Sequence, residues 1–221
     1  MPPKFSQNIY KGAVVEDHPS EFTKNIPRPL RLSPPIKAFD QDRSINADVV
    51  YSITSGNDMQ YFRIDPETAD IFVIKPIDLE ELDVEKFTLE ITARQKSNEL
   101  KFAIADIEIE VIDINDNKPE FEVEQYNMTV IENLPVGFRI LQFTAKDQDK
   151  GENGEFYYEL EDNSGAFILE DDGSLVLNKP SLFDREQMEN VVLKVLAIEK
   201  SDTVLENKVI ECNICFSAIN N

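Results

Sequence analysis

The feature that most constrains this chain is a set of polar motifs that occurs twice in the same order. The clearest pair is two Asp-Gln-Asp triplets, each followed by an asparagine and a tyrosine. They are Asp40–Asp42 with Asn46 and Tyr51, and Asp147–Asp149 with Asn153 and Tyr158. Glu16 and the run Leu82–Glu85 also have counterparts, at Glu132 and Phe183–Glu186. A period of about 105 residues is the length of a domain, so two similar domains are predicted.

Hydrophobic alternation indicates that both domains are built from strands. Phe87, Leu89, Ile91 and Ala93 alternate with polar residues, and so do Val191, Leu193, Val195 and Ala197. Such period-2 runs are typical of half-buried strands in antiparallel sheets. We therefore predict an all-β chain of two tandem β-sandwiches, each with about seven strands and about 100 residues. The predicted boundaries are 1–112 for the first domain, 113–119 for a linker and 120–221 for the second domain.

The charge of the chain excludes several classes of partner. Asp and Glu number 43 against 22 Lys and Arg, which gives a net charge of −21. Nucleic acids and anionic membrane surfaces attract basic proteins, so neither is expected to bind. An acidic excess either solvates the surface or ligates cations, and composition alone leaves both readings open.

Catalytic and redox chemistry find little support in the sequence. The chain has one histidine, His18, and its neighbours Asp17 and Pro19 form no nucleophile motif. Two cysteines are too few for a disulfide framework. No apolar run of about 18 residues is present, so no transmembrane helix is expected, and no signal peptide opens the chain. We expect no small-molecule substrate and no enzyme activity.

The segment between the two halves carries the most specific motif. Asp113-Ile114-Asn115-Asp116-Asn117-Lys118-Pro119-Glu120-Phe121 resembles the DxNDNxPxF linker of cadherins. Glu16 is similar to the glutamate of their XEX motif, Asp83 and Glu85 to the acids of LDRE, and Asp147 and Asp149 to the DxD pair. The resemblance covers essentially the whole chain. It implies tandem seven-stranded Greek-key sandwiches, cadherin-like and immunoglobulin-like, placed end to end.

The resemblance also implies a calcium site of about three ions, and calcium prefers such oxygen ligands. The expected carboxylate ligands are Glu16, Asp83, Glu85, Asp113, Asp116, Asp147 and Asp149. Asn115 would contribute its side chain, and Ile114, Asn117 and Asn153 their backbone carbonyls. Glu199 stands where the family usually has an aspartate and is expected to ligate as well, whereas the equivalent position of the first repeat is Gln95.

The ends of the chain depart from the linker pattern. Asp40, Asp42 and Asn46 are ligands of the type that serves a preceding linker, so another repeat is expected before this one. The final residues Ala218–Asn221 lack two acids of that pattern, although Glu132, Asp184 and Glu186 remain. The next linker is therefore expected to hold fewer ions or none.

By resemblance, the chain is a segment of a cadherin ectodomain on the extracellular side of the plasma membrane. Its expected partners are other cadherin ectodomains, in cis or in trans, and its expected role is calcium-dependent cell–cell adhesion. The chain has no tryptophan, so adhesion by exchange of an N-terminal tryptophan strand is excluded here. The alternative is a receptor segment for a non-cadherin ligand, for which the basic, proline-rich segment 18–37 is the only support.

Two smaller motifs concern modification and redox state. Asn127-Met128-Thr129 is an acceptor tripeptide for N-glycosylation. Cys212 and Cys215 have the CxxC spacing of redox and zinc sites, but residues three apart on a strand point to opposite faces. Aligned with the final strand of the first domain, Cys212 is predicted to be inward and Cys215 outward, with no disulfide between them.

Overall fold

The computed structural model describes residues 1–18, 20, 27–40, 48–82, 84–131, 134–162, 164–182, 190–200 and 208–217. The chain divides into two compact units, Met1–Ile114 and Asn115–Asn221, and the boundary lies inside the predicted linker. Strands form nearly all the regular structure of the described ranges, as predicted. A search of these same ranges found no helix of the length and apolar character that a bilayer span requires.

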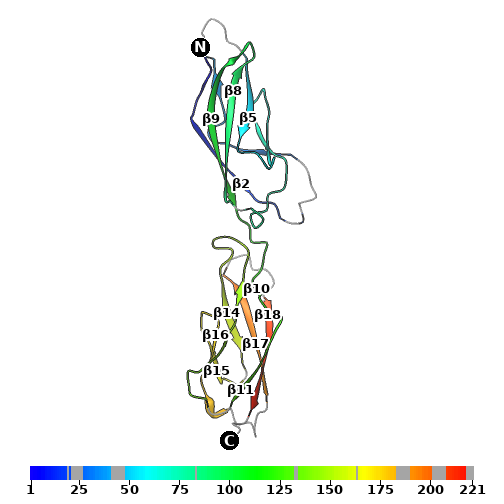
Figure 1. The fold of residues 1–221 in the computed structure, drawn as a ribbon, viewed down its shortest axis with the longest axis vertical. Coiled ribbons are helices and arrows are strands. Elements are labelled where there is room, and N and C mark those ends of the chain that lie inside the picture. Colours follow the sequence, from blue (N-terminus) through cyan, green and yellow to red (C-terminus); the bar gives the residue numbers. More distant parts are fainter. Residues whose placement is uncertain are drawn as a thin grey trace. The chain divides into compact units, whose positions relative to one another are not determined.

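The first unit contains nine described strands in three sheets (Figure 1). The four-stranded sheet has the order β2-β9-β8-β5, the three-stranded sheet the order β3-β7-β6, and β1 pairs with β4. The strands are β1 Lys4–Phe5, β2 Ile9–Val15, β3 Arg28–Leu30, β4 Ala38–Phe39, β5 Val49–Ser55, β6 Phe62–Ile64, β7 Ile71–Val73, β8 Lys86–Gln95 and β9 Asn98–Ile112.

The second unit repeats this arrangement. Its four-stranded sheet is β11-β18-β17-β14, its three-stranded sheet is β12-β16-β15, and β10 pairs with β13. The elements are β10 Glu120–Phe121, β11 Gln125–Ile131, β12 Arg139–Gln142, β13 Ala145–Lys146, β14 Phe156–Glu161, β15 Phe167–Leu169, β16 Ser174–Leu177, the 3-10 helix η2 Pro180–Leu182, β17 Asn190–Glu199 and β18 Lys208–Ser217. The described part of each unit has seven strands, as predicted, when the interrupted strands are each counted once: β1 with β2 and β3 with β4 in the first unit, and β10 with β11 and β12 with β13 in the second.

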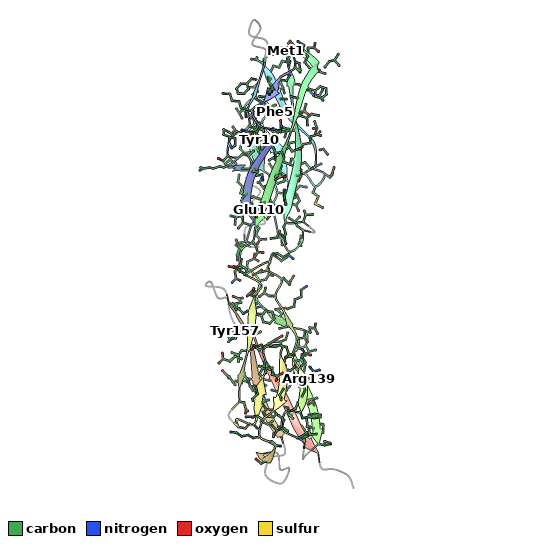
Figure 2. The ribbon with its side chains drawn as sticks, turned by 90° about the vertical axis from the view of Figure 1, so that its left-hand side faces the viewer. Met1, Phe5, Tyr10, Glu110, Arg139 and Tyr157 are labelled. Atoms are coloured by element: carbon green, nitrogen blue, oxygen red, sulfur yellow. The ribbon has the colours of Figure 1, made fainter. Side chains whose placement is uncertain are left out.

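Each unit has its own hydrophobic core between its sheets. In the first unit the inward residues of β8 and β9, such as Leu89 and Ile107, are opposite each other and fully buried. Phe5 and Tyr10, labelled in Figure 2, close the core from β1 and β2, with ring centroids 6.2 Å apart. Alternate side chains of a strand lie on the same face of the sheet. The apolar ones are removed from water on the inner face, which stabilises the paired strands.

The cysteines lie as the strand register predicts. Cys212 is opposite Leu193 of β17 and fully buried, whereas Cys215 is exposed, and both are free thiols. Burial raises the pKa of the Cys212 thiol to about 11. Cys212 therefore acts as a small core residue rather than as half of a redox pair.

Candidate metal centre

The acidic end of the first unit is created by two parallel strands that finish together. β2 pairs with β9 so that Val15 is opposite Ile112. Glu16 and Asp113 directly follow these two strands, and the backbone N–H of Glu16 donates to the carbonyl of Ile112 at 3.1 Å. The register of a strand pair therefore brings together two acids that are distant in the sequence.

The side chain of Glu16 is held in one orientation by two backbone donors. Its Oε1 accepts a hydrogen bond from the N–H of Ile114 at 2.7 Å, and its Oε2 accepts one from the N–H of Leu79 at 2.7 Å. Glu16 is only 4% exposed. The carboxylate thus connects the end of β9 to the turn around Leu79, and its position is fixed by the fold.

A third acid joins this group, and sequence analysis did not select it. Carboxylate oxygens of Glu16, Glu80 and Asp113 all lie within 4.8 Å of one another. Glu80 occupies the turn that begins at Leu79, the residue whose N–H binds Glu16. These three acids form the first-unit cluster.

The acid that the structure gathers with Glu16 and Asp113 differs from the LDRE acids predicted in the first repeat, Asp83 and Glu85. Glu85 is exposed and directly precedes β8, while its carbonyl accepts the N–H of Val111 at 3.0 Å. Glu80, and not Glu85, lies with Glu16 and Asp113. Asp83 falls outside the described residues.

A count from the strands would have identified Glu80. Phe87 of β8 is opposite Ile109, and Val191 of β17 is opposite Ile214, so Phe87 and Val191 are equivalent. Glu80 precedes Phe87 by the same interval at which Asp184 precedes Val191. Alignment on the inward residues of the strand is more reliable than alignment on loop letters, because loops absorb insertions.

In the second unit, the DxD pair follows the short strand β13. Asp147 and Asp149 are both buried, and the N–H of Asp149 donates to Oδ1 of Asp147 at 3.1 Å. Asn117 holds Asp149 twice, through its backbone N–H at 3.1 Å and its Nδ2 at 2.8 Å, both to Oδ1. The segment after residue 114 is therefore anchored to the DxD pair.

Asp116 lies beside the DxD pair, and together with Asn117, Asp147 and Asp149 it forms the second-unit cluster. Nδ2 of Asn117 also donates to Oδ1 of Asp116 at 2.8 Å, and oxygens of Asp116 and Asp149 lie within 4.8 Å of each other. Nδ2 of Asn115 donates to Oε2 of Glu199 at 3.1 Å. Glu199 ends β17 and is only 4% exposed, so this longer acid is held next to Asn115 of the linker.

Asn153 lies in the turn that passes the DxD pair. This turn covers residues 151–154, and Asn153 in it is half-buried. A Cβ at Gly154 would collide with the backbone oxygen of Asp149, so only glycine permits this approach. The expected role of the Asn153 carbonyl is thus consistent with its neighbourhood and stays a prediction.

The donor set favours a hard cation. All of the clustered groups are carboxylate, amide or carbonyl oxygens, which suit calcium or magnesium rather than zinc or copper. Two carboxylates at about 5 Å repel each other by roughly 3 kcal/mol at an effective dielectric near 20. Burial of several acids in one place is therefore costly unless positive charge is supplied.

Other expected ligands cannot be placed. Asp42, Asn46, Glu132, Asp184, Glu186 and Ala218–Asn221 lie outside the described residues. Asp40 is described, and its Oδ1 accepts a hydrogen bond from Nε2 of Gln95 at 2.9 Å.

Comparison with known proteins decides the family. The cadherin domain model matches residues 32–112 and again residues 126–214. The chain belongs to the cadherin family. Cadherin-89D of Drosophila melanogaster is 45% identical over 214 residues, which are 94% of this chain and 10% of that protein. Human Protocadherin-1 is 31% identical over 209 residues, 90% of this chain and 19% of that protein.

A solved structure agrees on the fold. Extracellular cadherin domains 1–5 of Protocadherin Gamma B2 match with a TM-score of 0.79 at 24% identity, over 99% of this chain and 39% of that chain. This likeness shows the fold alone. The two units are thus tandem repeats of the cadherin family, which is a family of ectodomain modules and not of enzymes. The chain spans only a small part of its curated relatives, 10% and 19% of the two named here.

Proposed function

We propose that this cadherin segment works in calcium-dependent cell–cell adhesion, with calcium bound by the acids that converge on residues 113–117. The observation that carries the proposal is the pair of clusters on this one segment. Asp113 joins Glu16 and Glu80 in the first unit, and Asp116 joins Asp149 in the second. A segment that contributes an acid to a cluster in each unit is suited to bind cations.

The proposed ligands follow the structure where it departs from the motif. The carboxylates are Glu16, Glu80, Asp113, Asp116, Asp147, Asp149 and Glu199. Asn115 would add its side-chain oxygen, and Ile114, Asn117 and Asn153 their carbonyls. About three divalent ions would supply positive charge that nearly balances the seven carboxylates. Hydrogen bonds within the chain hold Glu16 and Asp149 in place before any ion binds.

We further propose that the segment acts on the extracellular side of the plasma membrane, as a stiffened spacer or contact element. Its partners would be other cadherin ectodomains, in cis or in trans. The two named relatives are a cadherin and a protocadherin that are much longer than this chain, which supports a role as one part of an extended ectodomain.

Thermal unfolding with and without calcium tests the proposal. Ligand that binds only the folded state stabilises it by mass action. With a dissociation constant of about 10⁻⁴ M, typical of extracellular modules, calcium at about 1 mM adds about 1.4 kcal/mol per site. We expect a higher melting temperature in calcium than in chelator, and equal melting temperatures would contradict the proposal.

Two aspartate variants make the test specific. Asp116→Ala should remove most of the calcium-dependent shift, because Asp116 lies in the second-unit cluster. Asp106→Ala is the matched control, since Asp106 is half-buried in the middle of β9, between β2 and β8. It should leave the shift unchanged. Small-angle scattering of the same samples would show whether calcium narrows the range of shapes.

A further inference from the structure

The outward face of the four-stranded sheet in the second unit combines an unusual pair of asparagines with a free thiol. β11 is the edge strand of the order β11-β18-β17-β14, and Gln125, Asn127, Thr129 and Ile131 form its exposed row. Asn127 is opposite Asn213, and Thr129 is opposite Cys215. Tyr157, labelled in Figure 2, lies on β14 at the other edge of this sheet.

We propose that Asn127 carries an N-linked oligosaccharide that covers Cys215 on this face. The proposal rests on the proposed extracellular location, since the modification takes place in the secretory pathway. Nδ2 of Asn127 would form a bond to C1 of the first sugar, and the bond from C1 to the diphosphate of a lipid-linked oligosaccharide would break. The lipid diphosphate and a proton leave.

The hydrogen bond between the asparagines leaves the reactive nitrogen available. Nδ2 of Asn213 donates to Oδ1 of Asn127 at 3.1 Å. A glycosylated asparagine keeps its Oδ1, so this bond survives the modification. With Oδ1 held by the neighbouring strand, Nδ2 of Asn127 is turned away from Asn213. Asn127 is exposed on an edge strand, so a sugar chain there displaces no core residue.

The partner asparagine is a built-in control. Asn213-Ile214-Cys215 has a cysteine where the acceptor tripeptide requires serine or threonine. Asn213 is also half-buried and uses its Nδ2 as the donor to Asn127. The two asparagines are therefore neighbours of the same chemistry, and only Asn127 meets both the sequence and the structural requirement.

The position of the sugar has a consequence for Cys215. Neighbouring strands are about 4.8 Å apart and alternate residues about 6.7 Å apart, so Asn127 and Cys215 are separated by about 8 Å across the face. A branched oligosaccharide is larger than this distance. The glycan would therefore hinder access to the one exposed thiol among the described residues, which is otherwise open to oxidation in an extracellular setting.

The 221-residue chain, secreted from animal cells behind a cleavable leader, allows a direct test. We expect treatment with an amide-cleaving glycosidase to increase its gel mobility. Asn127→Gln and Thr129→Ala should abolish this shift, whereas Thr129→Ser and Asn213→Gln should retain it. Thr129→Ala keeps the Asn127 side chain, so it tests the proposal even if Asn127→Gln fails to fold. No shift in the unmodified sequence, or a shift lost only in Asn213→Gln, would overturn the proposal.

Thiol labelling tests the shielding. Cys215 should react several-fold faster after the glycan is removed, while Cys212 stays unlabelled until denaturant is added. Equal rates before and after removal would refute the covering of Cys215. Calcium-dependent unfolding of the unglycosylated chain is a separate measurement, so failure of the calcium proposal and failure of this one are distinguishable.

Discussion

Replacement of Glu16 by glutamine should have opposite consequences with and without calcium. Glu16 makes two charge-assisted hydrogen bonds, to the N–H groups of Leu79 and Ile114, each at 2.7 Å. A glutamine offers one oxygen, so one bond is lost and one N–H faces an amide nitrogen. A hydrogen bond to a charged group contributes about 1.5–3 kcal/mol, so Glu16→Gln costs about 3 kcal/mol from this source.

Removal of the charge acts in the other direction. Oxygens of Glu80 and Asp113 lie within 4.8 Å of an oxygen of Glu16. At an effective dielectric near 20, each such neighbour repels by about 3 kcal/mol. In chelator, relief of the repulsion from both neighbours, about 6 kcal/mol, outweighs the loss of about 3 kcal/mol from the hydrogen bond, so the free energy of unfolding should rise. In calcium, the variant loses the bond and also about 1.4 kcal/mol of binding linkage, so it should be clearly less stable.

Denaturant unfolding in chelator and in millimolar calcium measures the difference. Glu108→Gln is the matched control, because Glu108 is on the outward face of β9, where its contact with Lys86 lowers its pKa. This control should change equally in both conditions. Amide exchange of Leu79 and Ile114 reports the lost bond directly. An equal loss of stability for Glu16→Gln in both conditions would refute the reasoning.

Two further predictions concern the second unit. In the unglycosylated chain, thiol titration should label Cys215 at once and Cys212 only after unfolding, because burial raises the pKa of Cys212 to about 11. A Cys212–Cys215 disulfide found by mass spectrometry would contradict the strand register. Leu193→Ala, at a fully buried position, should lower the free energy of unfolding by about 2–5 kcal/mol, whereas Val192→Ala on the outward face should change it little.

The fold was predictable because its determinants are local and repeated. Alternate residues of β8 and β17 are apolar, and a strand with one buried face requires that pattern. The repeated motifs then supplied the number of domains. The interruption between β1 and β2 was not predicted. It arises because β1 pairs with β4 whereas β2 joins the four-stranded sheet. The hydrophobic periodicity of so short a segment does not indicate which sheet each half joins.

The site was predictable where ligands directly adjoin strands. Glu16 and Asp113 follow paired strands, so register fixes them. Glu80 was missed because it lies in a turn between strands. In such a turn, residues that resemble a motif can be displaced along the sequence from the position that is equivalent in three dimensions. The hydrogen bond from Leu79 to Glu16, which places that turn, is a long-range contact that the sequence does not display.

The position equivalent to Glu199 in the first repeat gives a final prediction. Gln95 is only 3% exposed, and its Nε2 donates to the carbonyl of Met1 at 3.0 Å and to Oδ1 of Asp40 at 2.9 Å. Gln95→Glu would replace this donor by a second carboxylate beside Asp40. An uncompensated buried charge of this kind typically costs about 3–5 kcal/mol, and we expect that loss at neutral pH in chelator.

The pH dependence separates charge from packing. Repulsion by Asp40 and loss of water would raise the pKa of the introduced carboxyl in the folded state above its unfolded value of about 4.3. Folding then favours the protonated form of the introduced carboxyl. The destabilisation is complete above the folded-state pKa, decreases as the pH falls through that pKa, and is absent below the unfolded-state pKa. Gln7→Glu, at an exposed position of the same unit, should show neither effect. A loss of stability in Gln95→Glu that persists unchanged into acid would mean that shape, and not charge, selects the neutral amide beside Asp40.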